Sequence, residues 1–304
     1  MDRPDRVKDR ISERLRIAGS LLFILLFFIL TAVLVKVPMD PGVFFSVTMA
    51  TIWFINSFGA VVQGSLFGLV GLLPQKYSTV FMSGQGLAGT FAALAMLLAL
   101  SSGTDSETAA LGYFITPCVG TLVSVASYLL LPQLKGVDPP LPPLVKCLNP
   151  IQRCVDPVCP VLTAPSLPLV FAERYFTPVC CFLAFNVMDW AGRTVTSFVR
   201  WPRKESPLFP VLVCCRVVFI PLLMLCNVQE RSYLPVLFSH DSIFALLMLL
   251  FSLSSGYCVC LSMSYAPQLV KPQDAETAGA LMAFFLALGL SLGAALSFPL
   301  RALV

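Results

Sequence analysis

The fold is decided by stretches such as residues 17–35, IAGSLLFILLFFILTAVLV, which run on without a single charged residue. Uncharged runs of similar or greater length recur at 41–75, 77–104, 108–134, 242–270 and 277–300. A helix needs roughly 20 mainly apolar residues to cross the hydrocarbon core of a bilayer. Each of these six runs therefore predicts a membrane-spanning helix.

Two more stretches, 175–199 and 207–229, are equally apolar but contain Asp189 with Arg193, and Arg216. The chain as a whole is 57% hydrophobic and only 12% charged, against about 25% charged residues in an average soluble domain. We therefore predict an all-α, polytopic membrane helix bundle with about eight transmembrane helices.

Composition divides the chain into three parts. Residues 1–134 form a predicted four-span amino-terminal bundle, and residues 173–304 form a four-span carboxy-terminal bundle. Residues 135–172 are rich in proline, which cannot continue helical hydrogen bonding, and they predict a linker. A basic arm precedes the first span and predicts a cytoplasmic amino terminus, because positive charges favour that side of the membrane: Arg3, Arg6, Lys8, Arg10, Arg14 and Arg16.

A second basic loop conflicts with this simple topology. Four crossings return the chain to the cytoplasm, so a fifth would deliver Arg200, Arg203 and Lys204 to the outside. Positive loops belong inside. One odd crossing is therefore expected between residues 135 and 172.

The intramembrane charges are the first candidates for a binding site. Asp189 and Arg193 are four residues apart, which places them on one helix face at salt-bridging distance. Together with Asn186 they offer donors and acceptors for a polar, uncharged solute such as a sugar or nucleoside. The alternative is an ion pair that only fixes helix packing. Gln63 needs a partner within its apolar span, from another helix or from a substrate.

Other features are assigned to structure. We expect the glycines of the second, third and eighth spans to allow close helix packing: Gly59, Gly64, Gly68, Gly84, Gly89, Gly289 and Gly293. Arg216 is expected to pair with a carboxylate or with carbonyl groups of another helix. The cysteines and the single His240 lack the spacing of a metal site, and the chain has no phosphate-binding glycine loop. We therefore expect no metal, cofactor, ATP, nucleic acid or enzymatic activity.

Several motifs resemble those of the equilibrative nucleoside transporters: residues 56–60 (NSFGA), 63–68 (QGSLFG), 82–89 (MSGQGLAG), 112–116 (GYFIT), 185–193 (FNVMDWAGR) and 275–280 (AETAGA). The chain looks most similar to the broad-selectivity plasma-membrane members. The family has eleven spans in a fold similar to the major facilitators and moves nucleosides down their gradient without ion coupling. By that comparison, this chain has counterparts of spans three to six and eight to eleven.

The resemblance also implies roles for individual residues. Gln63 looks like the glutamine that meets the nucleoside, Asp189 and Arg193 like the pair that contacts base and ribose, and Leu290 like an apolar wall. Gly59 and Gly84 match glycines linked to inhibitor sensitivity and transport. The implied function is facilitative transport of nucleosides of the uridine and adenosine class, and of nucleobases, across the cell membrane. The rival hypothesis is a truncated, non-transporting subunit that associates with full-length transporter.

Overall fold

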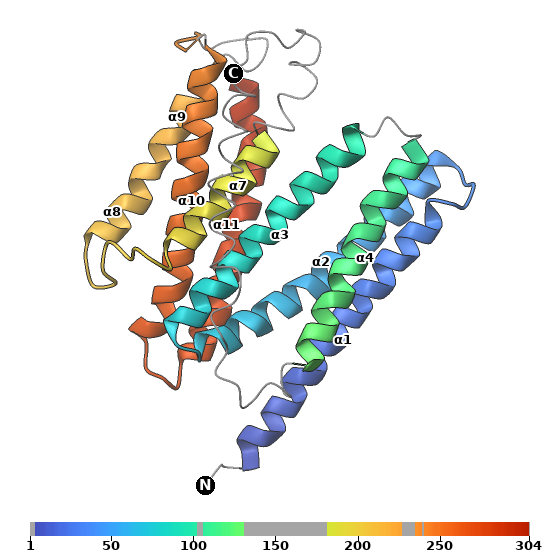
Figure 1. Cartoon of the computed structure of the whole chain (residues 1–304), viewed down its shortest axis with the longest axis horizontal. Helices are drawn as coiled ribbons and strands as arrows, with labels where there is room; N and C mark the ends of the chain where they lie inside the picture. Colours follow the sequence, from blue (N-terminus) through green and yellow to red (C-terminus); the bar gives the residue numbers. More distant parts are fainter. Residues whose placement is uncertain (1–3, 102–105, 131–180, 227–234, 239, 304) are drawn as a thin grey trace.

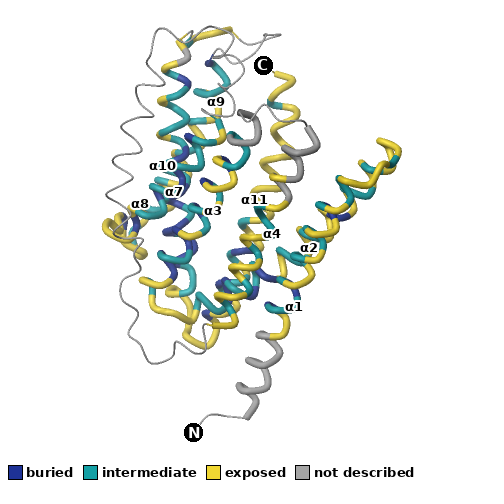
Figure 2. The backbone as a smooth tube through the Cα atoms, turned by 45° about the vertical axis from the view of Figure 1, so that its right-hand side comes forward, coloured by how far each residue is buried: buried dark blue, intermediate teal, exposed yellow. Residues whose placement is uncertain are grey.

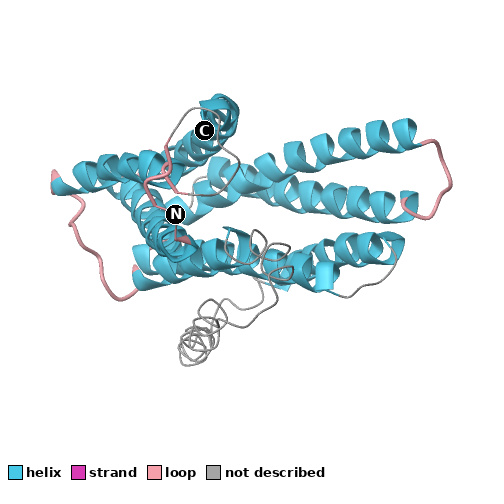
Figure 3. Ribbon diagram, turned by 90° about the horizontal axis from the view of Figure 1, so that it is seen from above, coloured by secondary structure: helices cyan, strands magenta, loops and turns pink. Residues whose placement is uncertain are grey.

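The structure, a computed structural model, describes residues 4–101, 106–130, 181–226, 235–238 and 240–303. The regular secondary structure of these residues is helical, apart from one isolated β-bridge between Cys226 and Phe238, and short loops join the helices (Figure 3). The all-α prediction is confirmed. The helices are α1 (Pro4–Leu34), α2 (Pro41–Gly71), α3 (Gln75–Ser101), α4 (Ser106–Leu130), α7 (Ala184–Val195), α8 (Leu208–Cys215), the 3₁₀ turn η4 (Arg216–Val218), α9 (Phe219–Met224), α10 (Asp241–Leu269) and α11 (Ala275–Leu303).

Each predicted span contains helix. Five helical segments in the described residues are long and apolar enough to cross a membrane: Leu15–Leu34, Pro41–Gly71, Gln75–Leu97, Ser242–Leu269 and Ala275–Leu303. Two shorter apolar helices, Ile115–Leu130 and Leu208–Met224, occupy two further predicted spans. The remaining one, 175–199, is described from residue 181 and contains α7. The predicted linker, residues 135–172, lies outside the described residues, so the three-part division stays a prediction.

The direction of the helices bears on the conflict over the basic loops. In Figure 1, α4 ends at the same end of the bundle as the amino terminus, whereas α7 begins at the opposite end and runs back. The loop after α7 therefore lies at the amino-terminal end, and Arg200 Nη1 donates to Gln75 Oε1 at the start of α3 (3.4 Å). The two ends that flank residues 131–183 are thus on opposite sides, as the charges of the loop require.

Proline explains why the span 207–229 is interrupted. Pro221 has no backbone N–H group and therefore cannot donate a hydrogen bond to the carbonyl group one helical turn earlier. The helix responds with the 3₁₀ turn η4 just before α9, where the backbone tightens. Arg216 stands at this break, between α8 and α9.

Glycines bring helix backbones into direct contact. A methyl group added to Gly256 of α10 would lie 2.7 Å from the carbonyl carbon of Asp189, and one added to Gly192 of α7 would lie 2.9 Å from the backbone nitrogen of Tyr257. At the α2–α11 contact, a methyl group on Gly71 would lie 2.6 Å from the Ala275 carbonyl oxygen, and one on Gly279 would lie 3.0 Å from the carbonyl carbon of Phe67. No larger residue fits these crossings without moving a helix.

The sequence singled out the wrong glycines in most cases. Gly68 and Gly89 do pack closely, against Glu276 and Asn186. The other five have open space where a side chain would begin, so the packing prediction is wrong for them: Gly59, Gly64, Gly84, Gly289 and Gly293. These five lie on parts of α2, α3 and α11 that face away from the helix crossings, and composition alone does not reveal which face of a helix is covered.

We predict that Gly256→Ala destabilises the protein on the order of 3 kcal/mol, because the added carbon meets backbone rather than a flexible side chain. The melting temperature of purified protein measures the effect. Gly120→Ala in α4 is the matched control, since its added carbon has no neighbour within 4 Å. Equal melting temperatures for the two variants would show that the α7–α10 crossing is not as tight as described.

Candidate functional site

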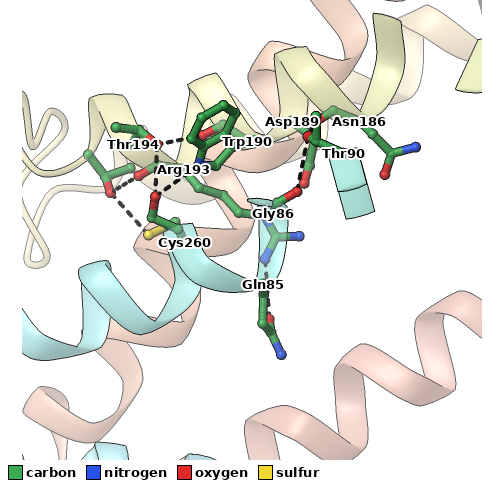
Figure 4. A network of polar contacts seen from close by, with 11 residues as sticks. Gln85, Gly86, Thr90, Asn186, Asp189, Trp190, Arg193, Thr194 and Cys260 are labelled. Atoms are coloured by element: carbon green, nitrogen blue, oxygen red, sulfur yellow. Dashed lines mark hydrogen bonds and ion pairs between the residues drawn. The ribbon is translucent and has the colours of Figure 1, made fainter. Parts of the chain in front are cut away.

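A seam of polar contacts joins α3 to α7. Ser83 Oγ shares a hydrogen bond with Thr194 Oγ1 (2.9 Å) and accepts one from Trp190 Nε1 (3.2 Å). About two helical turns further along α3, Thr90 Oγ1 donates to the Asn186 carbonyl (3.1 Å). Between them, Gly86 lets α3 approach so closely that an added methyl would lie 2.9 Å from Trp190 Cα. We call these contacts the α3–α7 seam (Figure 4).

The predicted ion pair forms and lies at this seam. Arg193 Nε donates to Asp189 Oδ2 at 2.7 Å, and the two side chains are only 15% and 12% exposed. Arg193 Nη1 also donates to Gln85 Oε1 of α3 at 3.3 Å. The guanidinium is therefore held from both sides, by a carboxylate of its own helix and by an amide of α3 (Figure 4).

Asn186 lies one turn before Asp189 on α7. Its side-chain nitrogen donates to the Phe182 carbonyl (2.7 Å), while its side-chain oxygen would lie 2.5 Å from a methyl group added to Gly89. Asn186 thus packs directly on the backbone of α3. It belongs to the α3–α7 seam, and its role in substrate binding stays a prediction.

The remaining candidates lie on surfaces that open away from the seam. Gln63, on α2, is half-buried, and its amide makes no hydrogen bond with any residue that the structure describes. Leu290 on α11 is 68% exposed. At Gly59 and Gly84, a methyl group added to the Cα atom would have no neighbour within 4 Å. The structure brings Asn186, Asp189 and Arg193 together. Gln63 lies one turn before Phe67, close to where α2 contacts α11, whereas Leu290 lies further along α11, beyond that contact.

One prediction about the intramembrane charges is wrong. Among the described residues, Arg216 pairs with neither a carboxylate nor a carbonyl group. Its Nε donates to Ser254 Oγ (3.2 Å), and its guanidinium carbon lies 5.2 Å from the centre of the Phe251 ring. A hydroxyl group and an aromatic face take the place of the expected partners.

Gln85 contacts the ion pair, although the signal for it in the sequence is weak. Its position in Ser83-Gly84-Gln85-Gly86 marks a polar side chain beside small residues, but only the structure shows it facing Arg193. Asp189 can accept hydrogen bonds, and Arg193 can donate several. The cluster is therefore suited to a neutral solute that carries both carbonyl and hydroxyl groups, in a place where lipid exposure of either charge is costly.

Comparison with known proteins shows that this chain belongs to the class of multi-pass membrane transporters. The family model described as nucleoside transporter matches residues 49–138 and 157–302. The chain belongs to the equilibrative nucleoside transporter family, whose members are transporters and not enzymes.

Individual relatives agree with this assignment. The chain is 47% identical to equilibrative nucleoside transporter 2 of Rattus norvegicus, over 97% of this chain and 80% of the relative. It is 43% identical to equilibrative nucleoside transporter 1 of Homo sapiens (97% and 77%) and 32% identical to equilibrative nucleoside transporter 3 of Rattus norvegicus (94% and 72%). The first alignment spans 365 residues, more than this chain has, so the relative carries residues within the matched region that this chain lacks.

We predict that Gln85→Leu lowers uridine uptake about tenfold, because a hydrogen bond to a charged group contributes about 1.5–3 kcal/mol and Leu cannot accept one. Gln85→Glu keeps an acceptor at the same reach and should retain more uptake than Gln85→Leu. Initial uptake rates, normalised to surface protein, measure both. Full uptake by Gln85→Leu would mean that Arg193 is oriented by Asp189 alone.

Proposed function

We propose that this chain mediates facilitated diffusion of nucleosides, of the uridine and adenosine class, with nucleobases as further substrates. The observation that carries the proposal is the Asp189–Arg193 pair, buried within apolar helices and held across the α3–α7 seam by Gln85. Membership in the equilibrative nucleoside transporter family supports the substrate class.

In this proposal the hydrogen-bonding groups of the nucleoside are divided between the two halves of the protein. Asp189 accepts from hydroxyl or amino groups, and Arg193 donates to carbonyl or ring nitrogen acceptors. Gln63 supplies an amide that is free of partners among the described residues. Leu290 provides an apolar wall for the base, with Asn186 beside the ion pair. The substrate would then draw α2 and α11 together where they are now apart.

Contacts between the amino-terminal helices (α1–α4) and the carboxy-terminal helices (α7–α11) support alternating access. These contacts involve the end of α2, α3 as far as Thr90, α7, the end of α10 and the start of α11, including Ser78 with Ser264, Thr90 with Asn186 and Gly71 with Ala275. Beyond them, α11 is largely exposed (Figure 2). Among the described residues, the two halves are thus in contact at the end that carries the amino terminus and along the α3–α7 seam, and the ribbon of α2 diverges from that of α11 towards the other end (Figure 1). We call the end that carries the amino terminus the closed end. Rocking of the halves about a central site is the general mechanism of such carriers.

We propose further that the closed end faces the cytoplasm and that the protein is in the cell membrane. Loops at the closed end carry Arg200, Arg203, Lys204 and Lys271, and Lys76 lies in the first turn of α3 at the same end. Positive loops favour the cytoplasmic side, so the amino terminus is cytoplasmic as well. In this orientation the structure represents an outward-facing state.

Cysteine labelling tests this orientation with a matched pair of exposed loop positions. We expect Lys204→Cys to react with a membrane-impermeant maleimide only after permeabilisation, because its loop lies at the closed end. Val37→Cys, in the loop between α1 and α2 at the other end, should react in intact cells. Gel-shift labelling above the background of the unsubstituted chain reports both. The reverse pattern would invert the proposed orientation.

Uridine uptake tests the function and separates it from a role of the ion pair in packing alone. Removing one member of a buried pair leaves an uncompensated charge, at a cost of about 3–5 kcal/mol, so both members must change together. We expect the exchange Asp189→Arg with Arg193→Asp, which keeps an ion pair but moves its charges, to lose uptake in transport-deficient cells.

The neutral pair Asp189→Asn with Arg193→Gln serves as the second variant, and surface protein is quantified for every chain. We expect it to lose uptake as well. Uptake by the exchanged pair close to that of the unsubstituted chain would assign the pair to packing. No uptake by the unsubstituted chain despite surface expression would favour the non-transporting subunit.

A further inference from the structure

A pocket lies among the carboxy-terminal helices, and its lining residues Val259 and Met282 also pack against the core cluster that contains Phe67 and Met82. It has a volume of about 220 Å³ and is bordered by α8, η4, α10 and α11, with Val213, Arg216, Ser262, Met282, Phe285 and Leu286 among its lining residues. Val213 and Phe285 are exposed, so the pocket opens to the outside of the bundle. None of the proposed nucleoside-binding residues lines it.

Arg216 is the one charged residue among the described residues that line this pocket, and most of its hydrogen-bonding capacity is unused. A guanidinium has five N–H groups. Nε donates to Ser254 Oγ, and the ring of Phe251 covers one face. The other four N–H groups make no hydrogen bond with any described residue. Unpaired donors are costly in apolar surroundings, and charges within spans are normally paired.

The depth of Arg216 limits what can pair with it. It follows Leu208, the first residue of α8, by about 12 Å at the usual rise of 1.5 Å per residue. Half of the hydrocarbon thickness is roughly 15 Å. Arg216 is therefore near the middle of the bilayer, out of easy reach of a phospholipid phosphate at the surface. A single-chain acid, which enters the bilayer in its neutral form, can bring its head group to this depth.

We propose that this pocket is a binding site for the carboxylate of a long-chain fatty acid. The carboxylate pairs with the free N–H groups of Arg216 in a bidentate arrangement, and the Ser262 hydroxyl lies in the same lining. The volume is below the roughly 300 Å³ of sites that enclose a whole drug-sized ligand. It holds the head group and the first part of the chain, and the rest lies along the exposed apolar surfaces of α8 and α11.

Equilibrium binding of tritiated oleate to the purified full chain in phosphatidylcholine nanodiscs tests the proposal. We expect saturable binding that weakens at least about tenfold in Arg216→Gln, because the charge-assisted hydrogen bonds are lost. Val213→Trp, which fills the pocket and leaves Arg216 in place, should weaken binding similarly. Arg301→Gln is the matched control, since it removes a positive charge from the end of α11, outside the pocket.

Two competitors identify the chemistry. Oleyl alcohol, with the same chain and no charge, should not displace oleate. Dioleoylphosphatidylglycerol that competes as well as oleate would overturn the proposal and assign the site to a phospholipid head group. Absence of saturable binding, or unchanged affinity in Arg216→Gln, would also overturn it. If Arg216→Gln is not monodisperse, unchanged affinity in Val213→Trp decides against the proposal.

Discussion

Direct contact between helix backbones is the constraint on which this structure depends. In lipid, apolar side chains gain little by leaving their surroundings, so helices associate through close packing and interhelical hydrogen bonds. Gly192 and Gly256 bring α7 and α10 together, and Gly86 lets α3 approach α7. The contact of α2 with α11 depends in the same way on Gly71 and Gly279. Side chains larger than hydrogen at these positions would separate the helices.

The position of the ion pair follows from these crossings. Asp189 lies on α7 where Gly256 meets its backbone, and Arg193 lies one turn further, next to Gly86. Because α3 approaches so closely, Gln85 reaches the guanidinium, and a pair within one helix becomes a contact between the two halves of the protein. In the proposed function, a substrate bound at this pair would contact both halves at once. This coupling is what a carrier with alternating access requires.

The sequence predicted the helices well, because uncharged runs report membrane crossings directly. It also predicted the Asp189–Arg193 pair, since a spacing of four residues sets a distance within a single helix. Contacts between helices were harder to predict. Gly59 and Gly84 gave the same signal as Gly68 and Gly89, yet only the second two meet a neighbour. The partner of Arg216 and the role of Gln85 likewise depend on which helix faces which, and periodicity does not encode that.

Counterflow in proteoliposomes tests facilitated nucleoside exchange by this chain most directly. Vesicles that contain the purified protein are loaded with unlabelled uridine and diluted into a trace of labelled uridine, without ATP or an ion gradient. A carrier that alternates between two sides should accumulate label transiently above its equilibrium level, and the Asp189→Asn, Arg193→Gln variant should not. Label that rises only to equilibrium, or equally in both proteins, would contradict an alternating site built on this ion pair.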